Sequence, residues 1–174
     1  MISIISGTNR KDANAAKIAK IYARLLDKAD ASYQTIDLQD LPKDFIFSAL
    51  YENSGKNGDF LDFQNKVDES DKLIFIISEY NGSYPGVLKA FIDGMRYPDT
   101  FKGKKAALVG LSAGSLGGAI AMSHFSDICQ YLEINTLPIR PKLANIYEHL
   151  SGENLKHTKY MEQIEAQVKA FLAF

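Results

Sequence analysis

The chain has 174 residues, of which 46% are hydrophobic and 24% charged, with a formal net charge of −1. These values are those of an ordinary globular protein, so we expect one domain over residues 1–174 around a single core. The nearly neutral charge excludes the strongly basic surface that would indicate nucleic acid or an acidic membrane as a partner.

Short apolar runs alternate along the chain with segments of helical periodicity. The predicted strands are Ile2–Ile5, Tyr33–Leu38, Lys72–Ile77, Lys105–Leu111 and Ile134–Leu137. The predicted helices are Ala13–Lys28, Asp59–Ser70, Pro85–Tyr97, Gly118–Leu132 and Asn154–Phe174. This alternation predicts an α/β fold, a three-layer flavodoxin-like sandwich whose five-stranded parallel sheet has the order 2-1-3-4-5.

The least regular segment, Asp40–Gly58, is rich in large apolar residues: Leu41, Phe45, Ile46, Phe47, Leu50 and Tyr51. Two interpretations stay open. The segment packs on its own core, or it forms a subunit interface or pocket wall.

Export and membrane insertion are not indicated. The first residues, MISIISGTNRK, lack a basic region followed by a long apolar stretch, so we expect no signal peptide and a cytoplasmic protein. The uncharged run Ala106–Met122 contains many Gly and Ser residues and is read as a strand, a loop and a helix start.

Metal and disulfide chemistry are not indicated either. The three histidines, at 124, 149 and 157, and the single cysteine form no metal-ligand spacing. Cys129 occupies an apolar helical position, and we expect a buried structural thiol.

Ligands of such sheets bind beyond the carboxyl ends of the strands, where the strand order reverses, and here that point lies between strands one and three. The loop after the first strand, residues 6–14, reads SGTNRKDAN. Gly7 permits a tight turn, Ser6 and Thr8 carry hydroxyls, Arg10 can pair with phosphate oxygens, and a helix start follows. We interpret this loop as a phosphate site rather than only a capped helix with solvated charges.

Two further loops reach the same edge. Residues 78–93 read SEYNGSYPGVLKAFID and place Tyr80 and Asn81 where they can border a planar ring. Residues 110–118 read GLSAGSLGG and leave room for a flat ligand against the backbone.

The three loops resemble the NADPH-dependent FMN reductase family of flavodoxin-like flavoproteins, which includes FMN-containing quinone and azo-dye reductases. The family's first loop reads approximately G-S-x-R-x-x-S-x-N, against GTNRKDAN at residues 7–14. Its second reads P-E-Y-N-x-S-x-P-G-x-L-K-N-x-x-D, against residues 78–93. Its third is a Ser-rich then Gly-Gly loop, which residues 112–118 match. This chain departs from the pattern at Thr8, Ala13 and Ser78, and the first two departures weaken phosphate binding.

The resemblance implies an FMN-dependent oxidoreductase that uses NADPH or NADH to reduce a small-molecule acceptor such as a quinone, free flavin or azo compound by ping-pong hydride transfer. It implies no catalytic side chain, because the cofactor carries the chemistry. It also implies a homodimer or homotetramer whose neighbouring aromatics complete the pocket. The cofactor-binding residues it implies are Ser6, Thr8, Arg10, Asn14, Glu79, Tyr80, Asn81, Gly82, Ser112, Ala113, Gly114 and Gly117.

Two alternatives remain at this point. Residues 110–114 match the G-x-S-x-G nucleophile elbow of α/β-hydrolases, with Ser112 as nucleophile and an acid (Glu133 or Glu148) and a base (His149 or His157) downstream. The other alternative is a non-enzymatic electron carrier like flavodoxin, although such carriers are strongly acidic for docking.

Overall fold

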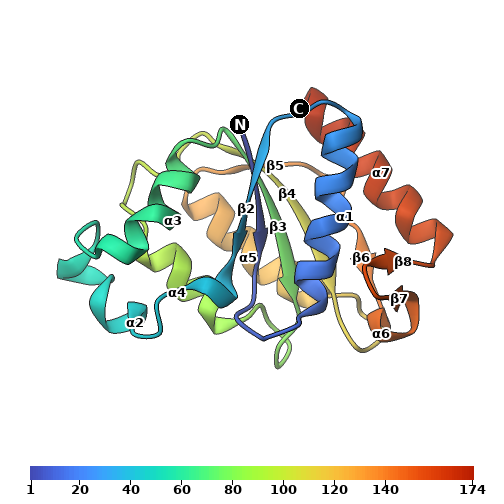
Figure 1. Ribbon diagram of the computed structural model, residues 1–174, viewed down its shortest axis with the longest axis horizontal. Coiled ribbons are helices and arrows are strands. Elements are labelled where there is room, and N and C mark those ends of the chain that lie inside the picture. Colours follow the sequence, from blue (N-terminus) through green and yellow to red (C-terminus); the bar gives the residue numbers. More distant parts are fainter.

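A parallel sheet forms the centre of the computed structural model, which describes residues 1–174 (Figure 1). Its strand order is β2-β1-β3-β4-β5, with every neighbouring pair parallel. The strands are β1 (Ile2–Ser6), β2 (Tyr33–Asp37), β3 (Lys72–Ser78), β4 (Lys105–Leu111) and β5 (Asn135–Thr136). The predicted fold class and strand order are confirmed.

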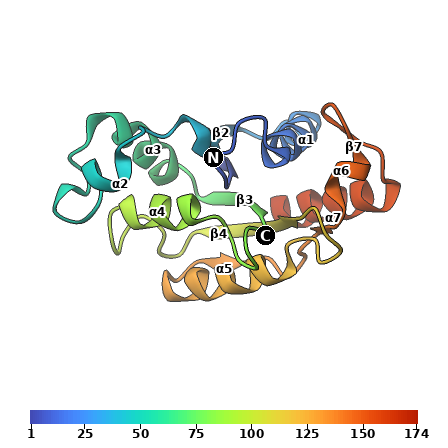
Figure 2. The ribbon, with the colours of Figure 1, turned by 90° about the horizontal axis from the view of Figure 1, so that it is seen from below.

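Helices cover both faces of the sheet (Figures 1 and 2). One face packs against α3 (Gly58–Asp68), α4 (Gly86–Gly94) and α5 (Ala119–Tyr131). The other packs against α1 (Asn14–Lys28) and α7 (Thr158–Ala173). No helix combines the length and the apolar character that a membrane span requires.

The apolar run of β3 explains why both faces need cover. Leu73, Phe75 and Ile77 belong to the core under α3, α4 and α5, whereas Ile74 and Ile76 belong to the core under α1 and α7. Successive side chains of a strand point to opposite faces, so an unbroken apolar strand must be buried on both sides.

The predicted fifth strand, Ile134–Leu137, is only partly right. The edge position is shared by β5, which pairs with the start of β4, and by β6 (Lys142–Leu143), which pairs with its end. Pro138 and Pro141 lie between the two pieces. Proline cannot donate to a strand ladder, so the edge strand is interrupted there.

The predicted last helix is too long at its start. Helix α7 begins at Thr158, and the residues before it form α6 (Ile146–His149) and an antiparallel hairpin of β7 (Leu150–Ser151) and β8 (Asn154–Leu155). The turn of the hairpin includes Gly152, whose φ is +59°. This conformation suits glycine and marks a turn that apolar periodicity does not reveal.

The irregular segment after β2 contains α2 (Phe45–Ser48) and two short 3-10 turns, Leu38–Asp40 and Tyr51–Asn53. Phe45, Ala49 and Leu50 are buried in the core under α4, which confirms packing on its own domain. Phe47 and Tyr51 are 85% and 82% exposed. The interface interpretation of these exposed aromatics stays a prediction.

Cys129 on α5 is fully buried, as predicted. Burial raises the pKa of its thiol to about 12, because the thiolate would lose its hydration inside the core. The residue is therefore an unreactive part of the packing.

Candidate functional site

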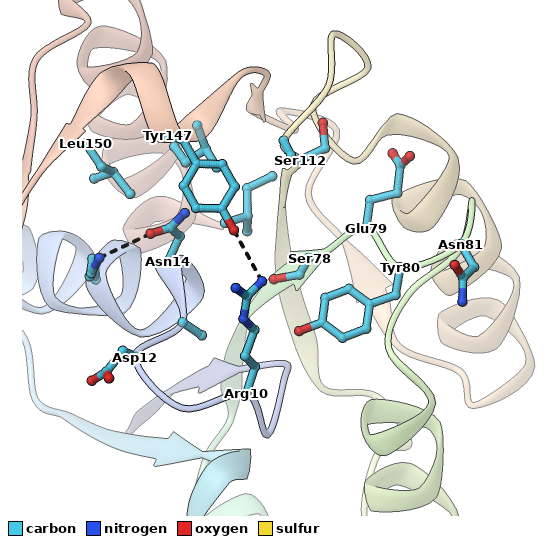
Figure 3. Close-up of a pocket in the computed structure, with 15 residues that line it drawn as sticks. Arg10, Asp12, Asn14, Ser78, Glu79, Tyr80, Asn81, Ser112, Tyr147 and Leu150 are labelled. Atoms are coloured by element: carbon cyan, nitrogen blue, oxygen red, sulfur yellow. Dashed lines mark hydrogen bonds between the residues drawn. The ribbon is translucent and has the colours of Figure 1, made fainter.

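A cavity of about 480 Å³ lies at the carboxyl edge of the sheet, among the loops that follow β1, β3 and β4 (Figure 3). Seven of the predicted cofactor-binding residues line it: Arg10, Asn14, Glu79, Tyr80, Asn81, Ser112 and Ala113. The other five, Ser6, Thr8, Gly82, Gly114 and Gly117, do not line it. Three loops far apart in the sequence thus form one cavity, with a volume in the range of small-molecule sites.

The loop after β1 begins at a position where only glycine fits. A Cβ on Gly7 would lie 2.7 Å from the Ile76 carbonyl oxygen and 3.2 Å from Leu88 Cδ2. The Gly7 N–H donates to the same carbonyl at 3.0 Å, which holds the loop against β3. The backbone can therefore turn close to the sheet before it enters α1.

The backbone N–H groups of residues 11–15 have no hydrogen-bond partner in the protein. Ala13 precedes α1 without a capping side chain, so the helix begins with its first donors unpaired. Free N–H groups at a helix N-terminus favour an anion. Arg10 lies beside them and lines the cavity.

Thr8 links the first two loops. Its hydroxyl shares a 2.7 Å hydrogen bond with the Tyr80 hydroxyl and accepts the Arg10 N–H at 3.3 Å. Thr8 and Ser6 are both buried. The Thr8 hydroxyl therefore positions Tyr80 and the Arg10 backbone.

The loop after β3 contains a tight turn at Asn81-Gly82, with φ of +51° and +73°. Tyr80 and Ser83 exchange two backbone hydrogen bonds across it, at 2.8 and 3.0 Å. Positive φ at both central residues is the reason for the Asn-Gly pair. The Glu79 N–H donates to the Leu111 carbonyl at 3.0 Å, and the N–H groups of residues 81 and 82 at the tip of the turn have no partner.

The loop after β4 is organised by Ser112. Its hydroxyl donates to the Gly114 carbonyl at 2.8 Å and accepts the Gly117 N–H at 2.9 Å. Gly117 is packed so closely that a Cβ would lie 2.7 Å from the Lys142 carbonyl carbon. Ser112 and Gly117 therefore shape the loop, and Ala113 is exposed at the cavity.

A fourth wall of the cavity is formed by residues that were not predicted from the sequence. It consists of Ile146, Tyr147 and Leu150, which follow β6. Figure 3 shows the Tyr147 ring opposite Tyr80, with its hydroxyl directed at Arg10. Arg10 Nη1 donates to that hydroxyl at 3.2 Å, which closes one side of the cavity. Because Tyr147 belongs to a four-residue helix, no periodic pattern could have indicated it.

Contacts on two sides hold this wall in place. The Ile146 N–H donates to the Ser112 carbonyl at 3.0 Å, which ties α6 to the loop after β4. On the other side, Glu153 in the β7–β8 turn accepts from Lys20 Nζ at 2.5 Å and lies 3.6 Å from the Arg24 guanidinium, both on α1. The wall therefore bridges the loop after β4 and helix α1.

The cavity carries two cationic and two acidic side chains. Arg10 and Lys17 form no salt bridge, and Lys17 donates to Asn14 Oδ1 at 3.3 Å. The Asp12 carboxylate points away from Arg10 and Tyr147 in Figure 3. Unpaired cations beside free N–H groups suit a phosphate, and the half-exposed Tyr80 suits a planar ring. The donor set therefore fits FMN.

The residues that the hydrolase alternative requires do not form a catalytic arrangement. The Ser112 hydroxyl is bonded within its own loop. The His149 and His157 rings pack on each other at 4.6 Å and on Tyr160, and neither forms a hydrogen bond with Ser112. A nucleophilic serine needs a base within hydrogen-bond reach, and none is present here.

Comparison with known proteins supports the same interpretation. Residues 1–146 match the family described as NADPH-dependent FMN reductase. A 2-hydroxy-1,4-benzoquinone reductase from Burkholderia sp is 33% identical over 140 residues, which are 76% of this chain and 72% of that protein. A quinone reductase from Pseudomonas putida is 28% identical over 120 residues, 67% of this chain and 62% of that protein.

Similarity of structure extends over nearly the whole chain. A flavoenzyme NAD(P)H:(acceptor) oxidoreductase from Paracoccus denitrificans superposes with a TM-score of 0.78 at 24% identity, and covers 99% of this chain and 94% of its own. At this identity the superposition supports the fold. Tyr147 and Leu150 lie just beyond the residues that the family matches.

Proposed function

The chain belongs to the NADPH-dependent FMN reductase family and is an FMN-dependent NAD(P)H oxidoreductase, and we propose that it reduces small quinones at the cavity between the loops after β1, β3 and β4. The observation that carries the proposal is the convergence of seven motif residues on this cavity. When bound there, FMN would accept a hydride from the nicotinamide and pass reducing equivalents to the acceptor.

Distinct residues would hold the two ends of the cofactor. Arg10, Asn14 and the free N–H groups of residues 12–14, which line the cavity, would bind the phosphate. Tyr80, the free N–H groups at Asn81 and Gly82, and the backbone around Ala113 would border the ring. Thr8, Gly114 and Gly117 would act indirectly, because their hydrogen bonds shape the loops.

The proposal of a quinone acceptor rests on the absence of catalytic side chains from the cavity, because the cofactor would then carry out the reaction. No histidine lines it, and its two carboxylates are not paired with a serine or cysteine nucleophile, so acid–base or covalent catalysis has no assembled side chains. Reduction of a quinone needs a hydride donor, a flat binding surface and hydrogen-bond donors for the quinone oxygens. The 33% identical relative is named for a benzoquinone substrate.

Steady-state kinetics with a fixed concentration of NADPH and a series of acceptors tests this assignment. We expect kcat/KM for 2-hydroxy-1,4-benzoquinone and 1,4-benzoquinone to exceed that for free FMN and for an azo dye. A higher kcat/KM for free FMN would show that the protein is a flavin reductase in the narrower sense. NADH in place of NADPH under the same conditions establishes the nicotinamide preference.

The oligomeric state is a separate proposal. We propose a homodimer in which exposed aromatics of the segment after β2 contact the second subunit. Phe47 and Tyr51 are large apolar side chains left in solvent beside a packed core, and contiguous exposed apolar groups mark interfaces. Light scattering after size exclusion should give twice the mass of 19.3 kDa. A monomer that keeps full activity on dilution would contradict it.

Two organisational proposals accompany these. We propose that residues 1–174 form a single domain, supported by one six-stranded sheet that packs against helices on both faces (Figure 2). We also propose a cytoplasmic location. Limited proteolysis of the FMN-loaded protein should leave one resistant fragment, and fractionation of the producing cells should recover the protein with cytoplasmic markers.

A further inference from the structure

Lys17 lies outside the sequence motif but inside the cavity. It follows Asn14 by three residues on α1, so the two side chains share one face of the helix. Its ammonium donates to Asn14 Oδ1 at 3.3 Å, the contact drawn from Asn14 in Figure 3. Its side chain is half-buried and lines the cavity together with Arg10.

The charge of Lys17 is not used by the fold. The neighbouring Lys20 forms a salt bridge with Glu153 at 2.5 Å, and Lys89 forms one with Asp93 at 2.6 Å. Lys17 forms none, and its bond is to a neutral amide oxygen. A half-buried ammonium facing a cavity without a carboxylate partner is suited to a ligand anion, because desolvation strengthens such a contact.

Lys17 also supplies a side-chain donor at a helix start that has none. Ala13, which precedes α1, lines the cavity and forms no capping hydrogen bond. At that position the chain offers an N–H group but no side-chain donor. The ammonium of Lys17, held by Asn14, is a donor on the same helix end.

We propose that Lys17 binds the phosphate of FMN and sets the preference of this protein for FMN over riboflavin. The inference rests on the proposed function, since it assigns a residue of the same site. Together with Arg10 it gives the phosphate two cationic partners, and riboflavin, which lacks the phosphate, gains nothing from either.

The test compares the two flavins on matched variants. Dissociation constants for FMN and riboflavin are measured by quenching of flavin fluorescence for wild type, Lys17→Met and Lys11→Met. Lys11 is an exposed lysine of the same loop that does not line the cavity, so its variant removes an equal charge at the wrong place. Thermal unfolding of each variant confirms that the fold is retained.

We expect Lys17→Met to weaken FMN binding by roughly tenfold, the effect of one charge-assisted hydrogen bond, and to leave riboflavin binding within about twofold. Raising the salt concentration should weaken FMN binding less in Lys17→Met than in wild type, because one phosphate contact is gone. Lys11→Met should behave as wild type.

Each other result overturns the inference. Unchanged FMN binding in Lys17→Met would show that the ammonium does not reach the phosphate. An equal loss of affinity for both flavins would place Lys17 at the part that FMN and riboflavin share. An equal loss of FMN affinity in Lys11→Met would show that any positive charge near the site has the same effect. A wild-type protein that binds neither flavin would refute the proposed function itself, and the inference with it.

Discussion

Gly7→Ala tests whether the loop after β1 owes its path to the absence of a side chain. The added methyl carbon would lie 2.7 Å from the Ile76 carbonyl oxygen, a distance that real Cβ atoms essentially never show. Carbon contacts in packed interiors prefer about 3.5 to 4.0 Å. The loop must therefore move away from β3, which also stretches the 3.0 Å hydrogen bond from the Gly7 N–H to the same oxygen.

The cost follows from overpacking against backbone. Inserting one methyl into a close-packed site costs about 1–3 kcal/mol. For a domain of this length, 1 kcal/mol corresponds to roughly 2–4 °C in the melting temperature, so Tm should fall by about 2–12 °C. FMN binding should weaken as well, because the displaced loop carries Arg10 and the free N–H groups of residues 12–14.

Gly86→Ala is the matched control. Gly86 is the first residue of α4, its φ is not positive, and a Cβ there would meet nothing within 4 Å. Alanine also has the higher helix propensity, so this variant should be as stable as wild type or slightly more stable. Thermal unfolding followed by circular dichroism measures both. If Gly7→Ala and Gly86→Ala have the same melting temperature, the steric argument for the loop is wrong.

Three further variants test other parts of the structure. Tyr147→Phe should weaken FMN binding by about two- to tenfold without a large change in Tm, because Arg10 loses the partner that orders it; unchanged affinity would contradict this role. Ser112→Ala should lower the free energy of unfolding by about 1–2 kcal/mol by leaving the Gly117 N–H without its acceptor, while a fluorophosphonate probe should label neither wild type nor variant; labelling of wild type alone would restore the hydrolase interpretation. Cys129→Ala should reduce the loss of unfolding free energy at alkaline pH, measured by urea unfolding at several pH values. Burial raises the pKa of the folded thiol from 9.0 to about 12. The thiol therefore contributes fully to the free energy of unfolding below pH 9, and this contribution falls by about 1.4 kcal/mol per pH unit up to pH 12. Equal alkaline slopes in both proteins would refute the thiol as the cause.

The sequence predicted the sheet because its first four strands are long and have clear apolar patterns. Lys72–Ile77 differs from β3 by one residue, and Lys105–Leu111 equals β4. The fifth strand was only partly predicted, because β5 and β6 have two residues each and are too short to show any periodicity. The hairpin before α7 was not predicted for the same reason, since β7 and β8 also have two residues each.

The candidate site was predictable where residues follow strands and unpredictable where contacts are long-range. Arg10, Tyr80 and Ser112 each come shortly after a strand, so parallel topology brings them to one edge. Tyr147 reaches the cavity through a bond to a residue 137 positions away in the chain, which no local pattern encodes. Lys17 falls inside the predicted helix Ala13–Lys28 and was not named as a site residue, although its place one turn after the loop could have indicated the cavity.

The most direct test of the account is the visible spectrum of the protein after incubation with FMN and removal of free flavin, followed by anaerobic addition of NADPH. The account predicts a retained flavin spectrum that bleaches when NADPH is added and returns when 1,4-benzoquinone follows. Retained flavin that does not bleach would indicate an electron carrier, and a colourless protein that FMN cannot titrate would contradict the assignment of the cavity.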